Sequence, residues 1–470
     1  MSKKDNYTIL HPDQETIVAQ CTPCGSGAIA LIRISGKCAI AIATKISKLA
    51  SGKKLSELQS HTIHFGWVMD EKNNTIDQVL FLLMHAPKTF TGQDTVEITC
   101  HNNQYIIENI INRAIECGAR LAQNGEFTKR AFLSGKMDLL QAEAVNELIH
   151  SQTQTALKSS LAQLEGSLSS WITKIEHDLL KALSFSEASF EFIEDEEIEF
   201  GAQIKKILEK NLATIKTLKK TFNNQKQIRE GIRIAIIGSV NAGKSSLFNI
   251  LLNQKRAIVT NIAGTTRDAI ESVVTRDGNN ISLIDTAGLR ETNNSIEKEG
   301  IGRSFDEAKK ADIIILVFDS SRILSQQEAY VYKKIIDEYK QKIIFVANKC
   351  DIKTQDNSTL DKILSTPELI EISSLENKNI NILESKIDQK IKTLFSQIES
   401  PFLLNKRQYN LLSGLENKLK ELTPLITKNP DYEIVSYHLK DALSYLSEFT
   451  GKTANEKSID LIFKEFCIGK

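Results

Sequence analysis

The sequence has neither an excess of one charge nor a long apolar run. Lysine plus arginine and aspartate plus glutamate each number 59 among 470 residues, so the formal net charge is zero. Any nucleic-acid contact therefore needs a local basic surface, because the chain as a whole has no attracting field. No 18 consecutive residues are apolar, and the start MSKKDNYTIL has no apolar signal core, so we expect a cytoplasmic protein without a membrane span.

Cysteine is also sparse. The seven cysteines are scattered and odd in number, which argues against a disulfide framework and favours a reducing compartment. Cys21 and Cys24 form a C-x-x-C pair that invites a zinc or redox interpretation. No second pair stands at metal-ligand spacing, so we interpret both as ordinary thiols.

The length predicts roughly three domains, and the pattern changes along the chain indicate their order. Residues 1–133 contain strand-like runs such as TIVAQ, AIALIRISG and VEITCH between glycine-rich turns, typical of a mixed α+β domain. Residues 134–229 predict long amphipathic helices. Strands and helices alternate over 230–393, as in a parallel sheet covered by helices, and 394–470 is helical again. We therefore expect an α/β domain inserted into one helical domain.

The clearest motif is GSVNAGKSSLFN, from Gly238 to Asn249, which fits G-x-x-x-x-G-K-[ST]. The strand-like run IRIAIIG precedes it and a predicted helix follows, the context that separates a phosphate loop from a chance match. Lys244 can reach the outer phosphate oxygens and Ser245 can ligate magnesium. A nucleotide phosphate site is predicted here.

Further polar residues follow at the expected places. Thr265 and Thr266 in AGTTRD can complete a magnesium shell, Asp285 in LIDTAG ends an apolar run, and Gly288 offers an N–H to a γ-phosphate. Asp351 in VANKCD can accept two N–H bonds from a guanine edge, which adenine cannot supply, so the site should prefer GTP.

The last base-contacting loop, EISSLENK, is only weakly specified and could be an ordinary strand end. The predicted GTP-binding residues are Asn241, Ala242, Gly243, Lys244, Ser245, Ser246, Thr260, Asn261, Ile262, Ala263, Gly264, Thr265, Thr266, Asp285, Thr286, Ala287, Gly288, Asn348, Lys349, Cys350, Asp351, Ser373, Ser374 and Leu375.

These motifs do not show which residue orients the water that hydrolyses GTP. Leu289 stands where Ras-like enzymes have a water-orienting glutamine, so catalytic help must come from elsewhere. Asn241 could hold a monovalent cation that supplies positive charge beside the phosphates. Glu297 is a second candidate, although spacing alone favours a solvated helix carboxylate.

Several motifs in one order give the chain a recognisable resemblance. TIVAQCTPCGSGAIALIRISG, FTGQDTVEITCH, GEFTKRAFLSGKMDLLQAEAVNELI, NAGKSSLFN, IVTNIAGTTRD, DTAGLRET and the terminal FCIGK resemble the MnmE (TrmE) family of tRNA modification GTPases over essentially the whole length. The resemblance implies a homodimer that forms a heterotetramer with a flavin-dependent partner, MnmG. It also implies addition of an aminomethyl or carboxymethylaminomethyl group to carbon 5 of the wobble uridine of certain tRNAs.

The resemblance also assigns roles to single residues. It implies a 5-formyl- or methylene-tetrahydrofolate site at Arg33, Glu97, Lys136 and Lys470. It implies a potassium site at Asn241, Thr260, Ile262 and Thr265, and magnesium ligands at Ser245 and Thr266. Glu297 then becomes the water-orienting carboxylate, and Cys467 matches a functional C-terminal cysteine whose chemical role stays open.

Two competing functions remain at this stage. A purely regulatory GTPase switch would fit the nucleotide motifs, but it has no need of a folate-type domain or a terminal Cys-Ile-Gly-Lys. A folate enzyme with a vestigial GTPase is disfavoured because every nucleotide motif is intact. A basic run from Lys205 to Arg229 could track tRNA phosphates, although such runs are more often solvated helix faces.

Overall fold

The computed structural model describes residues 15–23, 25, 27–189, 200–220, 222, 229, 231–253, 270–276, 279–285, 305–352, 368–396, 402–427, 430–453 and 455–469. The chain forms two compact units. Unit 1 comprises Met1–Ile149, Leu161–Lys216 and Asn405–Lys470, and unit 2 comprises His150–Ser160 and Thr217–Leu404. The chain thus passes from unit 1 into unit 2 and back twice, and the longer passage, Thr217–Leu404, contains the α/β segment that the sequence predicts as an insertion.

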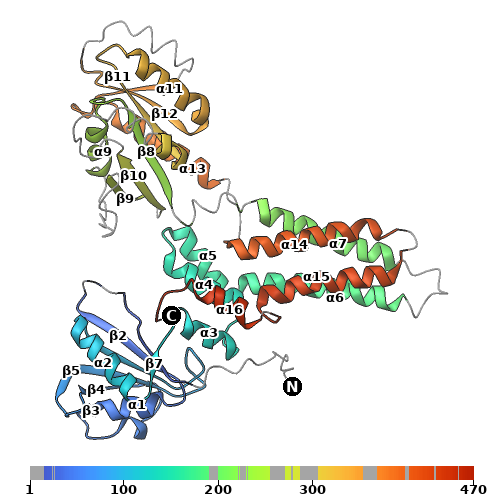
Figure 1. Cartoon of the computed structure of the whole chain (residues 1–470). Helices are drawn as coiled ribbons and strands as arrows, with labels where there is room; N and C mark the ends of the chain where they lie inside the picture. The colour runs from blue at the N-terminus through green and yellow to red at the C-terminus, as the bar shows by residue number, and fades with distance from the viewer. Residues whose placement is uncertain are drawn as a thin grey trace. The chain divides into compact units, whose positions relative to one another are not determined.

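The N-terminal part of unit 1 is built on a seven-stranded sheet with the order β3-β4-β5-β6-β2-β1-β7 (Figure 1). All neighbouring strands pair antiparallel except β1 and β7, which are parallel. The strands are β1 (Ile17–Gln20), β2 (Ile29–Ser35), β3 (Ser47–Leu49), β4 (Thr62–Met69), β5 (Thr75–Met84), β6 (Thr95–His101) and β7 (Arg120–Leu121).

Helices cover one face of this sheet. The amphipathic helices α1 (Ala39–Ile46) and α2 (Gln104–Glu116) pack on alternate strand residues in a shared core that includes Phe81 and Ile98. A short 3₁₀ turn η1 (Leu55–Glu57) adds Leu55 to that core. The opposite face carries large apolar side chains that are exposed, among them Phe65 and its direct cross-strand partner Leu80.

The helical part of unit 1 uses chain from both sides of the inserted unit 2. Helix α6 packs on α15, and α15 also packs on α14. The helices are α3 (Glu126–Leu133), α4 (Leu139–His150), α6 (Ser167–Ala188), α7 (Phe200–Lys220), α14 (Lys406–Leu422), α15 (Tyr432–Thr450) and α16 (Glu456–Phe463), with the 3₁₀ turn η4 (Thr423–Leu425) after α14. Helix α5 (Gln154–Leu164) belongs to unit 2 up to Ser160 and to unit 1 from Leu161.

A buried ion pair joins the two pieces of helical chain. Arg407 at the start of α14 donates from Nε and Nη2 to the two carboxylate oxygens of Glu143 on α4, at 2.6 and 2.8 Å. Gln408 donates to the same carboxylate at 2.7 Å, and its Oε1 accepts the N–H of Asn405 in a capping box. Glu143 is almost completely buried, and its partners Arg407 and Gln408 both come from the chain beyond the insertion.

Unit 2 is a doubly wound α/β domain. Its six-stranded sheet has the order β13-β12-β11-β8-β10-β9, parallel except for the edge strand β9. Its elements are β8 (Ile232–Gly238), α9 (Lys244–Asn253), β9 (Ile270–Arg276), β10 (Asn279–Asp285), β11 (Ile313–Asp319), α11 (Gln326–Tyr339), η3 (Lys340–Lys342), β12 (Ile343–Asn348), β13 (Leu369–Ile372) and α13 (Ile380–Ser396).

Both faces of this sheet are buried, which explains the near-continuous apolar runs in its central strands. Ile313, Ile315 and Val317 of β11 pack in a core with α9 and α13. Ile314 and Leu316 of the same strand pack in a second core with α11. The predicted fold class, a mixed α+β domain and a helical domain with an inserted P-loop domain, is confirmed.

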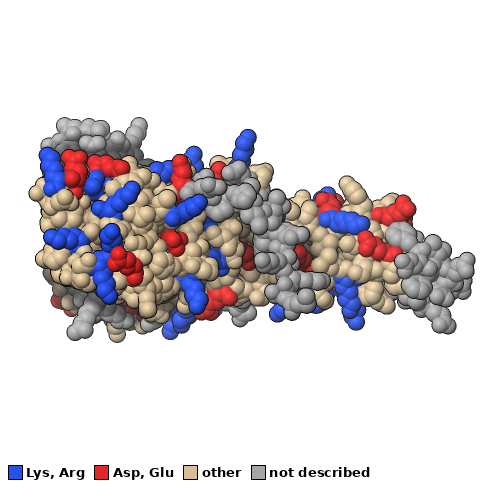
Figure 2. All heavy atoms as spheres, turned by 90° about the horizontal axis from the view of Figure 1, so that it is seen from below, with Lys and Arg blue, Asp and Glu red and all other residues tan. Residues whose placement is uncertain are grey.

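The surface agrees with the balanced charge. On the face that Figure 2 shows, lysine and arginine side chains are intermixed with aspartate, glutamate and uncharged ones, without a broad single-sign area. Within the described ranges, no helix combines the length and the apolar character that crossing a membrane requires. On α7, Lys210 of the basic run pairs with Asp178.

We expect Arg407→Ala to destabilise the helical part by about 3 kcal/mol, because a buried Glu143 carboxylate would lose its charged partner. Chemical denaturation followed by circular dichroism measures the change. Lys452→Ala is the matched control, since Lys452 forms an exposed pair with Glu176 whose loss should cost less than about 1 kcal/mol. Equal stability of the two variants would show that the Glu143 pair does not hold the two pieces together.

Candidate functional site

The phosphate loop lies between β8 and α9, at the carboxyl edge of the parallel sheet. Two of its residues have left-handed backbone, Asn241 with φ of 63° and Gly243 with φ of 89°. A Cβ on Gly243 would lie 2.1 Å from Nδ2 of Asn348, so only glycine fits between the loop and β12. The loop N–H groups and the first turn of α9 form the anion-binding concavity that the sequence predicted.

Lys244 and Asp285 flank the loop. Lys244 is buried, and its Nζ donates to the carbonyl of Ser239 at 2.7 Å. Burial lowers the pKa of Lys244, against the opposing field of Asp285. Asp285 is the last residue of β10, which lies beside β8, so its buried carboxylate and the Ser245 hydroxyl stand at the same sheet edge. Both are oxygen ligands of the kind that magnesium prefers.

The base-recognition loop follows β12 and is hydrogen-bonded to the phosphate loop. Nδ2 of Asn348 donates to the carbonyl of Ala242 at 2.8 Å. Oδ1 of Asn348 accepts from both the N–H and the hydroxyl of Ser374, each at 3.0 Å. Lys349 has φ of 69° and its Nζ lies 2.6 Å from Oδ2 of Asp319. One asparagine therefore holds three loops in register.

Asp351 is the residue that points to guanine. Its Oδ1 is buried and has no hydrogen-bond partner among the described residues. An orphaned buried carboxylate oxygen is costly unless a ligand donates to it. The N1–H and N2–H groups of a guanine edge are such donors, so the Asp351 carboxylate fits the predicted base.

The structure brings most of the described nucleotide residues together. The carboxyl edge of the sheet carries these residues on loops, at strand ends and in the first turn of α9, namely Asn241 to Ser246, Asp285, Asn348 to Asp351, Ser373 and Ser374. Leu375, by contrast, is 87% exposed. The remaining predicted residues lie outside the described ones, namely Thr260, Asn261, Ile262, Ala263, Gly264, Thr265, Thr266, Thr286, Ala287, Gly288, Glu297 and Lys470.

A second polar cluster, largely buried, lies on the face of the unit 1 sheet that is opposite α1 and α2. Arg33 on β2 pairs directly with Glu97 on β6, and both Nε and Nη2 of Arg33 contact one oxygen, Oε1, at 2.8 and 2.7 Å. Nη1 of Arg33 and Oε2 of Glu97 have no partner among the described residues. The guanidinium lies over the rings of Phe90 and Phe127, at 5.7 and 5.3 Å from their centroids. A donor, an acceptor and two aromatic faces are thus available together.

Lys136 and the C-terminal segment reach the same region. Nζ of Lys136 donates to the carbonyl of Pro87, and its Cε lies near Gly92, in the loop that carries Phe90. The carbonyl of Cys467 accepts the N–H of Gly125 at 3.2 Å, two residues before Phe127. Cys467 itself is exposed. Three of the four residues implied for folate, and Cys467, therefore contact one set of loops.

Sequence reasoning missed several residues that shape these sites. Phe90 and Phe127 flank Arg33, and Ser239, Asp319 and Arg322 connect the two nucleotide loops. The sequence did carry a signal for two of them. Asp319 and Arg322 stand at the carboxyl end of the apolar run of β11, and in a parallel sheet that end faces the ligand.

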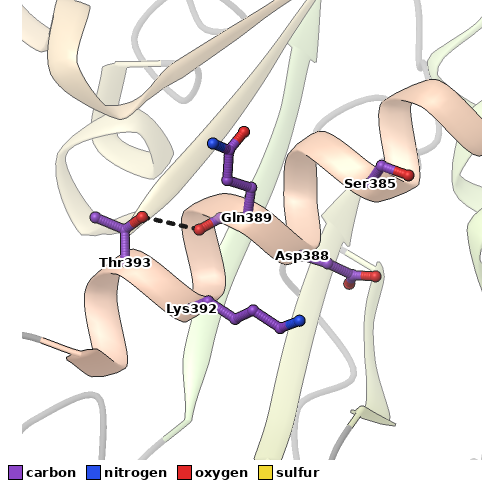
Figure 3. Close-up of a pocket in the computed structure, with 5 residues that line it drawn as sticks. All are labelled: Ser385, Asp388, Gln389, Lys392 and Thr393. Carbon is purple, nitrogen blue, oxygen red and sulfur yellow. Dashed lines mark hydrogen bonds between the residues drawn. The ribbon is translucent and has the colours of Figure 1, made fainter.

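The cavity in Figure 3 lies apart from these residues. Its volume is about 490 Å³, and one helix, α13, supplies the lining residues Ser385, Asp388, Gln389, Lys392 and Thr393. In the close-up these side chains leave α13 in different directions, and the Thr393 hydroxyl donates to the Gln389 carbonyl. None of them belongs to either predicted site.

The phosphate loop, the buried Asp285 and the guanine-directed Asp351 at one edge of a parallel sheet define a P-loop GTPase. Residues 16–136 match the family model "GTP-binding protein TrmE N-terminus" and residues 139–467 match "MnmE helical domain". The chain therefore belongs to the MnmE family of tRNA modification GTPases, and it is a GTP hydrolase that acts in tRNA modification.

Curated relatives agree along the whole length. The tRNA modification GTPases MnmE of Bacillus subtilis and Aquifex aeolicus are each 37% identical over 97% of this chain and 100% of their own. The one from Lachnoclostridium phytofermentans is 36% identical over 97% of this chain and 99% of its own. Among solved structures, Aquifex aeolicus Era bound to GDP and aluminium fluoride is 27% identical over 34% of this chain and 56% of its own, with a TM-score of 0.27.

We expect Asp351→Asn to weaken GTP binding roughly 100-fold or more, because an amide cannot replace both charged hydrogen bonds to guanine. Xanthosine triphosphate should then bind better than GTP, since its second base carbonyl accepts from the new amide. Titration with fluorescent nucleotides measures both affinities. Asp337→Asn, on the exposed face of α11, is the matched control and should bind GTP normally. Unchanged GTP affinity of Asp351→Asn would contradict the base assignment.

Proposed function

We propose that this chain is a potassium-activated GTPase that, with a flavin-dependent partner, modifies carbon 5 of the wobble uridine of certain tRNAs. The added group is aminomethyl or carboxymethylaminomethyl, and its carbon comes from 5-formyl- or methylene-tetrahydrofolate. The observation that supports the proposal best is the Arg33 cluster, which consists of Arg33, Glu97, Phe90 and Phe127. These polar and aromatic groups could bind a ligand, and they are far along the chain from the nucleotide loops. A purely regulatory GTPase has no need of such a cluster.

The residues of this cluster fit a folate. Pterin presents alternating donors and acceptors, which suit the open Oε2 of Glu97, and its flat ring suits the faces of Phe90 and Phe127. The glutamate tail of folate suits Arg33 and the Lys136 ammonium. Lys470 is proposed to assist, and Cys467 to act on the same substrate.

Potassium activation rests on Asn241. Its side chain is exposed at the phosphate loop and has no hydrogen-bond partner among the described residues, so its amide oxygen is available to a cation. A cation there would supply the transition-state charge that an arginine supplies in other GTPases. Thr260, Ile262 and Thr265 are proposed to complete the site, with Glu297 orienting the water and Ser245 and Thr266 ligating magnesium.

A homodimer is supported by the uncovered face of the sheet in unit 1. Ile63 and Phe65 on β4 are 62% and 48% exposed, and Leu80 on β5 is 41% exposed. The cross-strand pairing places them side by side on the face opposite α1 and α2. A contiguous apolar face of this kind usually marks an interface, and a second copy covers it most simply.

The remaining partners follow from the family. We propose a heterotetramer with the flavin-dependent MnmG subunit, with tRNA as the substrate and the cytoplasm as the compartment. Cys38, Cys100, Cys117 and Cys350 are free thiols, which suits a reducing compartment. GTP hydrolysis is proposed to be coupled to pairing of two inserted domains across their nucleotides.

Arg33→Ala should weaken folate binding at least about tenfold, because the tail carboxylates lose their charge-assisted hydrogen bonds. Cells that carry only this variant should lack the modified wobble nucleoside, which mass analysis of tRNA hydrolysates measures. Arg113→Ala on α2 removes an arginine that pairs only locally with Glu116, and serves as the control for both measurements. Normal folate affinity and normal modification in Arg33→Ala would refute the folate assignment.

GTP hydrolysis should be faster in potassium than in sodium at equal ionic strength, and Asn241→Ala should abolish the difference. Loss of a charge-stabilising group of this kind costs about 10²- to 10³-fold in rate. Phosphate release at saturating GTP measures it. Asn249→Ala, an exposed asparagine on α9, should keep the full potassium response. Equal rates in both salts for the unaltered protein would exclude a cation at Asn241.

A further inference from the structure

The phosphate loop adopts a conformation that depends on its surroundings. Asn241 and Gly243 both have left-handed backbone, which glycine adopts freely and asparagine tolerates. Contacts outside the loop then select this conformation from the others that these residues could adopt. The far end is fixed by the bond from Asn348 to the carbonyl of Ala242.

The near end, Ser239, is held through three of its polar groups. Its N–H donates to Oη of Tyr332 at 2.7 Å, and that hydroxyl donates in turn to the carbonyl of Val317 at 3.1 Å. Its carbonyl accepts from Lys244. Its side-chain hydroxyl accepts from Nη2 of Arg322 at 3.0 Å. Of these contacts, the last links the loop to a charged side chain 83 residues away.

Arg322 is itself firmly positioned in the turn between β11 and α11. Its Nη1 and Nη2 contact the two oxygens of Glu328 at 3.0 and 2.6 Å. Glu328 also closes the capping box of α11 through the N–H of Ser325. The hydrogen bond from Arg322 lowers the pKa of Glu328 to about 2, so this carboxylate stays charged near neutral pH. The guanidinium thus reaches Ser239 with little freedom left to lose.

The same guanidinium faces the base-recognition loop. Nε of Arg322 lies 3.6 Å from Oδ2 of Asp319, the oxygen that also holds the Lys349 ammonium. Burial raises the pKa of Asp319, but hydrogen bonds from Lys349 and Ser321 outweigh it and lower the pKa overall. Arg322 therefore lies between the residue that opens the phosphate loop and the carboxylate that aligns the lysine of the base loop.

We propose that Arg322 is a positioning residue for nucleotide binding, which fixes the entrance of the phosphate loop through the hydroxyl of Ser239. Arg322 does not touch the nucleotide in this scheme. It keeps the loop N–H groups aimed at the phosphates before the nucleotide arrives, so its loss shortens the residence time of GDP and GTP. Because the contact is a single hydroxyl bond, its removal leaves the fold of unit 2 intact.

A double-mutant cycle in the full-length protein tests this proposal, with dissociation of a fluorescent GDP analogue in magnesium as the readout. Ser239→Ala and Arg322→Ala should each speed dissociation about tenfold, the effect of losing one charge-assisted bond. The double variant should be no faster than Arg322→Ala alone, because Arg322→Ala already lacks the contact to Ser239. Ser239→Thr keeps the hydroxyl and should restore slow release.

The thermal midpoint of the nucleotide-free protein separates positioning from folding. Ser239→Ala should leave that midpoint unchanged while reducing the upward shift that added GDP produces. This variant carries the test even if Arg322→Ala, which also loses the Glu328 pair, proves unstable. Wild-type GDP release from Ser239→Ala, or effects that multiply in the double variant, would overturn the proposal.

Discussion

The ion pair between Glu143 and Arg407 is the interaction on which the architecture of unit 1 depends. It closes the helical part across 264 residues of sequence, most of which belong to the inserted unit 2. Closing so long a loop costs conformational entropy, but the cost grows only logarithmically with loop length. Packing between α6, α14 and α15 can therefore offset this entropy cost. The buried bidentate pair between Arg407 and Glu143 specifies that α14 meets α4. The insertion is tolerated because both of its ends leave from one closed helical body.

The C-terminal segment extends this closure to the sheet of unit 1. Gly125 and Gly469 both have left-handed backbone. A Cβ on Gly125 would lie 2.5 Å from the carbonyl oxygen of Phe463, and a Cβ on Gly469 would lie 2.3 Å from that of Gln20. Backbone therefore packs against backbone at both ends of the segment, and side chains such as Cys467 are left exposed. Lys129 adds an ion pair to Asp460 on α16. The backbone position of Cys467 is thus set by its neighbours in the segment.

The sequence predicted the parts of both sites that depend on local order. A glycine loop between a strand and a helix, an aspartate at a strand end and an Asn-Lys-x-Asp motif at the end of a buried strand are each complete within a few residues. Lys244, Asp285 and Asp351 could therefore be proposed from the sequence, and the structure places all three at one sheet edge. The fold class was predictable for the same reason, since strand and helix periods change at the domain boundaries.

What the sequence could not supply are contacts between distant segments. The partners of Ser239, 83 and 93 residues away, depend on the order of strands in the sheet, which periodicity does not determine. The aromatic rings around Arg33 likewise come from the loop before β6 and from α3. The folate residues, and the potassium residues other than Asn241, came from the family resemblance alone, and all of these assignments stay predictions.

The described contacts separate nucleotide binding from hydrolysis. Asn348, Asp319 and Ser239 fix the phosphate and base loops through hydrogen bonds within the protein, so the binding surface exists before GTP arrives. Preorganisation of this kind stabilises the bound nucleotide and its transition state equally, and so cannot by itself accelerate hydrolysis. Rate control must then reside in groups that meet the γ-phosphate from other stretches of the chain or from a second copy. A GTPase built this way can hold GTP firmly and hydrolyse it only when those groups assemble.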